Sequence, residues 1–197
     1  MRMSRKFQCL LSFVFCTVTL TFIGSCTAIF DNLLFSCSLI CNPPSQEEKI
    51  AYEIVKDLTH NWKTRYGLNF SGWGGTRDDS KRKTIEIWLI TRKVLSKDEG
   101  RILLLECIEE ALLAFNSCSK YREFMADYPF TGKNMHIDIV VQPQKGLTAS
   151  YPDICMFGYY NGKLVFLTKS PDKPFGFHTQ EEEAHEEAVT APSKSQK

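Results

Sequence analysis

The sequence lacks an excess of charge of either sign. Its 197 residues include 24 Lys and Arg against 23 Asp and Glu, a net charge of +1. Three of the basic residues, Arg2, Arg5 and Lys6, precede residue 7, which leaves 21 basic against 23 acidic residues in the remainder, a net charge of −2. Domains that bind nucleic acids generally carry a basic excess on one face. The balance therefore argues against a nucleic-acid partner.

The common nucleotide-binding motifs are also missing. The glycine-rich stretch Gly72-Trp73-Gly74-Gly75 has neither the Lys-Ser/Thr pair of a P-loop nor the GxGxxG pattern of a dinucleotide loop. Such glycines typically permit tight turns or close backbone approach. An aromatic residue on a glycine-rich loop is also a common recognition element, so Trp73 is a candidate ligand contact. These patterns predict no cofactor.

The cysteines form no recognisable disulfide framework. Cys107 and Cys118 share one predicted helix, but eleven residues at 1.5 Å per residue separate them by about 16 Å, which exceeds the reach of a disulfide. We expect both to be small core residues. Cys37 and Cys41 have CxxxC spacing without a second pair, which favours inert thiols over a metal site. The eight cysteines occupy positions 9, 16, 26, 37, 41, 107, 118 and 155.

The longest uncharged run lies near the beginning of the sequence. Residues 7–22 follow the three basic residues, contain no charge and are rich in Leu, Phe, Val and Thr. A basic start followed by 16 uncharged, mostly apolar residues is typical of a secretory signal peptide and is short for a membrane span. The residues Ile23-Gly24-Ser25-Cys26 follow directly.

Residues 1–26 resemble the signal peptide of bacterial lipoproteins, in which an aliphatic residue and two small residues precede a cysteine. The resemblance implies that residues 1–25 are removed, that the Cys26 thiol receives a diacylglyceryl group, and that the new amino terminus is acylated, for example with palmitate. Several acyl chains anchor a protein stably in a bilayer, because each buried CH₂ contributes about 0.8 kcal/mol. The protein is then held on the cell membrane or outer membrane, with its domain outside the cytoplasm, as in the periplasm.

Two other interpretations of this segment remain open. A general signal peptidase can cut after Ala28, because Cys26-Thr27-Ala28 has the small-x-small form. Alternatively, residues 7–30 persist uncut as one uncharged span, long enough to cross a membrane with tilt. All three interpretations place the folded part outside the cytoplasm.

After the anchor, the sequence divides into three parts. Residues 26–44 form an apolar tether that ends at Asn42-Pro43-Pro44, which breaks any helix. Residues 45–169 carry regular apolar periodicity and predict one globular domain. Residues 170–197 are rich in Glu, Pro, Ser and Lys and predict a disordered acidic tail.

The globular part predicts two amphipathic helices. Ser45 with Glu48, and Ser96 with Glu99, match capping boxes. The first helix has apolar residues at every fourth position and ends near Gly67. The second has a broader apolar stripe that reaches residue 117 or beyond, as expected of a helix largely covered by a sheet.

Strands are predicted between and after these helices. Residues 84–91 and 135–141 alternate apolar and polar positions, residues 68–73 are a short candidate, and Asn161-Gly162 between two apolar runs signals a hairpin. Short connections favour a mostly antiparallel sheet of four to five strands with both helices packed on one face. The predicted fold class is therefore α+β.

His136 and Asp138 lie two residues apart on one predicted strand and so share a face. A His/Asp pair can serve acid–base chemistry or bind a metal, but no neighbouring motif supplies a nucleophile or a third ligand, so no catalytic or metal-binding residue is assigned. We expect a bilayer-anchored cell-envelope lipoprotein whose domain binds another protein or the envelope. The alternative is an anchored enzyme or a small-ligand-binding domain that uses Trp73, His136 and Asp138.

Overall fold

The computed structural model describes residues 43–170 and 177–191. The predicted signal peptide and Cys26 lie outside the described residues. Within the described part, no helix has both the length and the apolar character needed to cross a membrane. The elements follow in the order α3 (Gln46–Tyr66), β1 (Asn69–Gly74), β2 (Arg77–Asp78), β3 (Lys81–Arg82), β4 (Ile85–Thr91), α4 (Lys97–Ser117), η2 (Arg122–Phe124), η3 (Gly132–Asn134), β5 (Met135–Val141), β6 (Ile154–Tyr160), β7 (Lys163–Lys169), β8 (Phe177–Ala184) and α5 (His185–Thr190).

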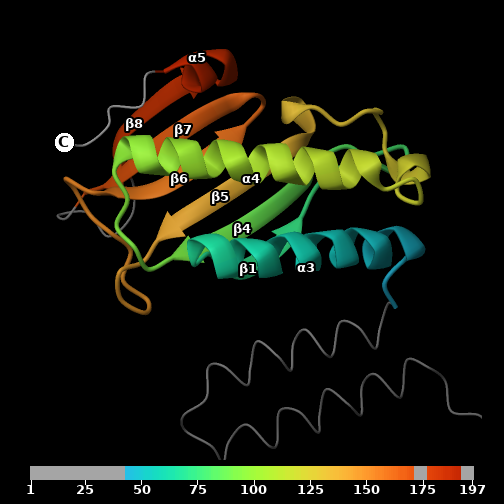
Figure 1. Ribbon diagram of the computed structural model, residues 1–197, viewed down its shortest axis with the longest axis horizontal. Helices are drawn as coiled ribbons and strands as arrows, with labels where there is room; N and C mark the ends of the chain where they lie inside the picture. Colours follow the sequence, from blue (N-terminus) through green and yellow to red (C-terminus); the bar gives the residue numbers. More distant parts are fainter. Residues whose placement is uncertain (1–42, 171–176, 192–197) are drawn as a thin grey trace, which may run out of the picture. The chain divides into compact units, whose positions relative to one another are not determined.

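A six-stranded sheet in the order β1-β4-β5-β6-β7-β8 forms the centre of the fold (Figure 1). β4 and β5 are parallel, because α4 carries the chain back along the sheet before β5 begins, and the other neighbouring pairs are antiparallel. β2 and β3 form a separate small hairpin. The predicted α+β class is confirmed. The predicted count of four to five strands is wrong, and the sheet is mixed.

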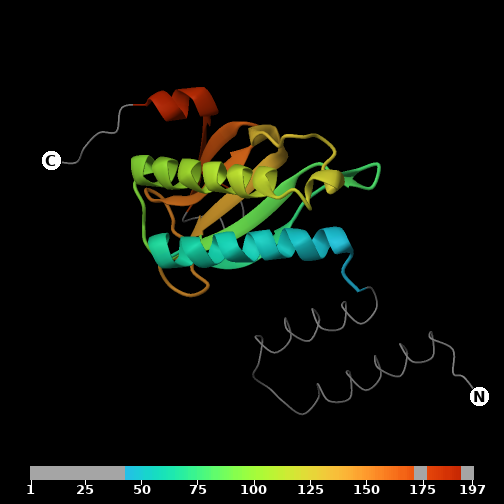
Figure 2. The same ribbon diagram turned by 45° about the vertical axis from the view of Figure 1, so that its right-hand side comes forward.

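All the described helices pack on one face of the sheet. α3 packs against β1, α4 against β5 and β6, and α5 against β7 and β8 (Figures 1 and 2). β4 and β5 alternate buried residues that face these helices with residues that face away. None of the described helices covers the opposite face, which we call the open face. The largest fully buried side chains of the core belong to Trp62, Tyr121, Tyr159, Phe115 and Phe157.

Both predicted capping boxes are present. The backbone N–H groups of Ser45 and Ser96 donate to the carboxylates of Glu48 and Glu99 at 2.8 and 2.9 Å, and each serine hydroxyl accepts the glutamate N–H in return. The first helix ends at Tyr66 and is capped by Gly67, whose φ of 71° is the left-handed conformation that favours glycine. The sequence therefore placed both helices correctly.

Residues 177–190, for which the sequence predicts a disordered tail, instead form β8 and α5. The Lys97 ammonium and the Arg101 guanidinium of α4 each lie 2.7 Å from the Glu183 carboxylate. These cations lie more than 80 positions away in the sequence, so composition alone could not reveal that the glutamate run has partners. β8 also pairs with an edge of β7 that would otherwise leave its backbone groups unpaired.

A buried carboxylate at the start of α3 connects three segments of the chain. Glu47 accepts hydrogen bonds from Arg82 Nε at 2.9 Å, from Arg82 Nη2 at 3.0 Å and from the Tyr121 hydroxyl at 2.7 Å, and Arg77 adds a further ion pair. Burial raises the pKa of Glu47, but the hydrogen bonds from these three partners outweigh it, and the pKa lies below its ordinary value. The carboxylate is therefore charged in the folded protein.

Replacement of this carboxylate is expected to destabilise the fold strongly. In Glu47→Ala, the buried Arg82 guanidinium loses its counter-charge, and the free energy of unfolding should fall by about 3–5 kcal/mol in urea titrations. Because the pKa of Glu47 is lowered, its stabilisation is present above about pH 4.3 and disappears as the pH falls through the folded-state pKa.

Glu53→Ala is the matched control on the same helix. The Glu53 carboxylate is 65% exposed and lies 3.5 Å from Lys56, so its loss should change the unfolding free energy by less than about 0.5 kcal/mol. Equal losses in the two variants would contradict a structural role for the buried carboxylate.

Candidate functional site

His136 and Asp138 lie side by side on the open face of β5. The residues between and beside them are buried against the helices, whereas these two are only partly buried. In register with them, β4 places Glu86 next to His136 and Trp88 next to Asp138. The prediction that His136 and Asp138 share one face is confirmed, and the structure adds two side chains from the neighbouring strand.

Trp73 lies on the other side of the sheet. It pairs with Ile87, which is fully buried beneath the helices, and the Arg82 guanidinium lies 5.7 Å from the centre of its ring. The grouping of Trp73 with His136 and Asp138 is therefore wrong in space. Most of the Gly-Trp-Gly-Gly stretch also belongs to strand β1 and not to a loop.

Trp88 is the tryptophan that faces the candidate site. A Cβ atom placed on Gly72 or Gly74 would lie only 3.1 or 3.2 Å from its indole ring, so these glycines leave the space that the ring occupies. Trp88 lies over β1 and is still 39% exposed. The sequence offers one signal for this arrangement: glycines at alternate positions of a strand leave one face without side chains, which an aromatic residue of the next strand can cover.

Tyr160 takes a similar position on the other side of Asp138. Its hydroxyl donates a hydrogen bond to the Asp138 carboxylate. Gly158 faces Asp138 across the two strands, and a Cβ atom there would lie 2.6 Å from the Tyr160 ring. Asp138 is thus flanked by two aromatic residues, each placed over glycine. We call Glu86, Trp88, His136, Asp138 and Tyr160 the open-face cluster.

His136 completes the cluster without forming a hydrogen bond to a described residue. Its ring centre lies 5.4 Å from that of Tyr160, and its Nδ1 atom lies 3.6 Å from the nearest Glu86 oxygen, too far for a good hydrogen bond. Its Nε2 atom is buried and has no partner in the described part of the chain. A general base must reach the proton that it removes, and a buried Nε2 is poorly placed for that.

Burial shifts the pKa values of Asp138 and Tyr160, the hydrogen-bonded pair at the centre of the cluster. It raises the pKa of Asp138, which the Tyr160 hydrogen bond and the nearby His136 partly oppose. Burial also raises the pKa of Tyr160, and its bond to the Asp138 carboxylate raises it further. Tyr160 therefore remains a protonated donor at neutral pH. The cluster can accept and donate hydrogen bonds beside an exposed indole ring, the chemistry of a recognition surface.

The described cysteines take no part in this site. Cys107 and Cys155 are buried and Cys118 is half-buried, and all three are free thiols. Burial raises the pKa of the Cys107 thiol, which makes it a poor nucleophile at neutral pH. Within residues 43–170 and 177–191, no group of three His, Cys, Asp or Glu side chains is arranged to hold a metal ion.

Comparisons with known proteins returned no relatives. No family model matches the sequence, no curated protein matches it, and no solved structure matches the fold.

The bond between Tyr160 and Asp138 can be tested by a single deletion of the hydroxyl. In Tyr160→Phe, Asp138 loses its donor, so its pKa should rise further and the protein should lose about 1–3 kcal/mol of stability at pH 7. NMR titration of the Asp138 carboxyl carbon measures the pKa. Tyr52→Phe, which alters an exposed tyrosine of α3, should leave the Asp138 pKa in place. A pKa that falls in Tyr160→Phe would refute this account of the pair.

Proposed function

We propose that this chain is a membrane-anchored lipoprotein of the cell envelope and that its folded domain is a non-enzymatic binding module. The sequence Ile23-Gly24-Ser25-Cys26, after an uncharged apolar segment, is the observation that carries the anchor. Acylation at Cys26 would hold the protein on the cell membrane or outer membrane. The two proline residues Pro43 and Pro44 separate this segment from the capping box of α3.

The open face supports the binding part of the proposal. The open-face cluster spans three adjacent strands, β4, β5 and β6, and none of the described helices covers it. Trp88 offers a flat apolar surface, and the carboxylates of Glu86 and Asp138 lie beside it on the same face. Stacking on an aromatic ring combined with a few oriented polar groups is the usual composition of a recognition site. An extended envelope component fits such a broad surface.

The alternative function, an anchored enzyme or small-ligand-binding domain, has one observation in its favour: His136, Asp138 and Tyr160 lie together. Two features weigh against catalysis. Asp138 is already engaged by Tyr160, and His136 hydrogen-bonds to no hydroxyl or thiol of a described residue. Non-enzymatic binding is therefore the better-supported proposal.

The anchor is tested by removal of one sulfur atom. Cys26→Ala should abolish incorporation of labelled palmitate and release the protein from the membrane fraction, because the thiol is the site of lipid attachment. Cys37→Ala, which removes a thiol eleven positions further on, should keep both. Intact mass of the unaltered protein reports the cleavage position and the acyl chains together. A Cys26→Ala protein with unchanged mass and membrane partition would exclude lipidation at this residue.

The binding surface is tested separately, with the anchor intact. Detergent-solubilised full-length protein is incubated with purified peptidoglycan sacculi and with outer-membrane vesicles, and the bound fraction is measured by sedimentation. Trp88→Ala should weaken binding roughly tenfold, as expected for the loss of about 1.4 kcal/mol of stacking. Tyr52→Ala, on the helix side of the domain, should bind as the unaltered protein does. Equal binding by Trp88→Ala would rule out the open face as the binding surface.

A further inference from the structure

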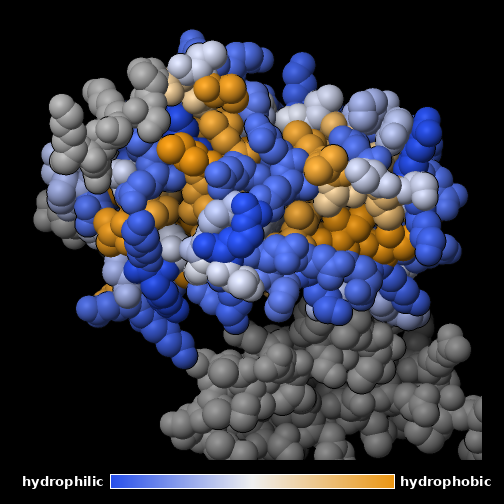
Figure 3. Space-filling model, viewed as in Figure 1, coloured by the Kyte–Doolittle hydropathy of each residue, from blue (hydrophilic) through white to orange (hydrophobic). Residues whose placement is uncertain are grey.

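α4 has an apolar surface on its outward side in addition to the side that faces the sheet. Ile102 is 45% exposed and Leu113 is 69% exposed, and Leu105 lies half-buried between them. These positions follow helical spacing and share a stripe. The outward side of a surface helix is normally polar. Figure 3 shows apolar side chains gathered on this side of the domain.

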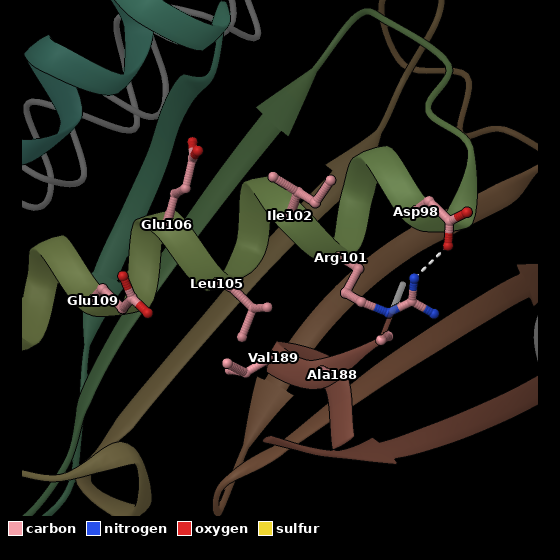
Figure 4. A pocket seen from close by; sticks show the side chains of 9 residues that line it. Asp98, Arg101, Ile102, Leu105, Glu106, Glu109, Ala188 and Val189 are labelled. Atoms are coloured by element: carbon pink, nitrogen blue, oxygen red, sulfur yellow. Dashed lines mark hydrogen bonds and ion pairs between the residues drawn. The ribbon is translucent and has the colours of Figure 1, made fainter. Parts of the chain in front are cut away.

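α5 lies alongside part of this stripe and forms a groove with it. The groove has a volume of about 280 Å³. Ile102 and Leu105 line it from α4, and Ala188 and Val189 line it from α5. Figure 4 shows Leu105 and Val189 next to each other, and Val189 is 55% exposed. The groove therefore presents apolar side chains from two helices to solvent.

The rim of the groove is acidic. Its charged lining residues are Asp98, Glu106 and Glu109 against the single cation Arg101, a net charge of −2. Arg101 is already bound to Asp98 and to Glu183 (Figure 4 draws the pair with Asp98). Glu106 and Glu109 are exposed and form no ion pair with any other described residue. The Glu109 carboxylate can therefore meet cations from outside, and so can that of Glu106, which also lies near Tyr66 of α3.

The acidic rim favours some possible occupants of the apolar groove over others. Anionic lipid head groups would be repelled by the acidic rim. A second copy of this chain, packed face to face about a two-fold axis, would bring two acidic rims together. The volume lies just below the usual range of pockets for small molecules, so it suits a few apolar side chains. An amphipathic helix with basic flanking residues can place apolar side chains in the groove and pair its cations with the acidic rim.

We propose that the groove between α4 and α5 docks an amphipathic helical segment of a partner protein. Apolar residues of that segment, spaced at i, i+3 or i+4 and i+7, pack into the groove that Ile102, Leu105 and Val189 line. Its Lys or Arg side chains pair with Glu106 and Glu109. This surface lies on the helix side of the sheet, away from the open face, so it provides a second binding function independent of the first.

Photo-crosslinking in intact cells tests this proposal on the full-length chain. In Val189→p-benzoylphenylalanine, irradiation should join the groove to one partner protein, and mass spectrometry should place the adduct in a peptide with apolar residues at helical spacing and at least two Lys or Arg. Leu113→p-benzoylphenylalanine, on the same stripe, repeats the test if the first variant does not accumulate. Tyr52→p-benzoylphenylalanine, an exposed position of α3, should not give that adduct.

Charge reversal then tests the role of the rim. Adding Glu106→Lys and Glu109→Lys together should lower the yield of the adduct by roughly fivefold or more, whereas Glu53→Lys on α3 should leave it unchanged. No adduct, an adduct with lipid or with a second copy of this chain, or an adduct with an acidic or neutral peptide would overturn the proposal. These outcomes do not depend on Trp88 or Cys26, so failure here is distinguishable from failure of the proposed anchor or of open-face binding.

Discussion

The buried carboxylate of Glu47 is the interaction on which much of the helix layer depends. Two residues after the N-cap Ser45 of α3, it joins that helix to Arg82 of the small hairpin and to Tyr121, which follows α4. Three segments of the chain are thereby fixed to each other. A charged group is stable in such a place only when its hydrogen-bonding capacity is used, and here three side chains donate four hydrogen bonds.

The sheet separates the domain into two surfaces with different chemistry. On the helix side, Lys97 and Arg101 of α4 neutralise glutamates of β8, and the apolar stripe of α4 continues out to the solvent. On the open side, Trp88 and Tyr160 lie over glycines and enclose Asp138. With the two proposed binding surfaces on opposite sides of the sheet, the occupation of one face would leave the other accessible.

Local signals in the sequence identified much of the fold. The two capping boxes, the helical periodicity after them and the Asn161-Gly162 turn depend on neighbours within a few residues, and each was found where the sequence places it. Pairings across long distances were not visible. The contact of Glu183 with α4 joins residues 82 positions apart, so the glutamate run predicted a solvated tail.

In the candidate site, too, the sequence reveals what depends on neighbouring residues and not what depends on strand pairing. His136 and Asp138 share a face because alternate residues of a strand always do, so the sequence was sufficient to pair them. The position of Trp73 among glycines suggests a place beside His136 and Asp138. In the structure, the register of β1 places Trp73 on the helix side and Gly72 and Gly74 on the open face. Trp88 is the residue that uses this space. Only the strand pairing, which the sequence did not fix, distinguishes the two tryptophans.

The two outer strands of the sheet disfavour edge-to-edge association between molecules of this protein. β1 is interrupted by a bulge between Phe70 and Gly72, and β8 exposes Glu181 and Glu182 along the other margin. An irregular strand and a strongly charged strand are both poor templates for a strand of another molecule. The proposed lipid anchor would confine these molecules to a plane, where they would collide far more often than in free solution, and sheets with such margins would resist joining into ribbons there.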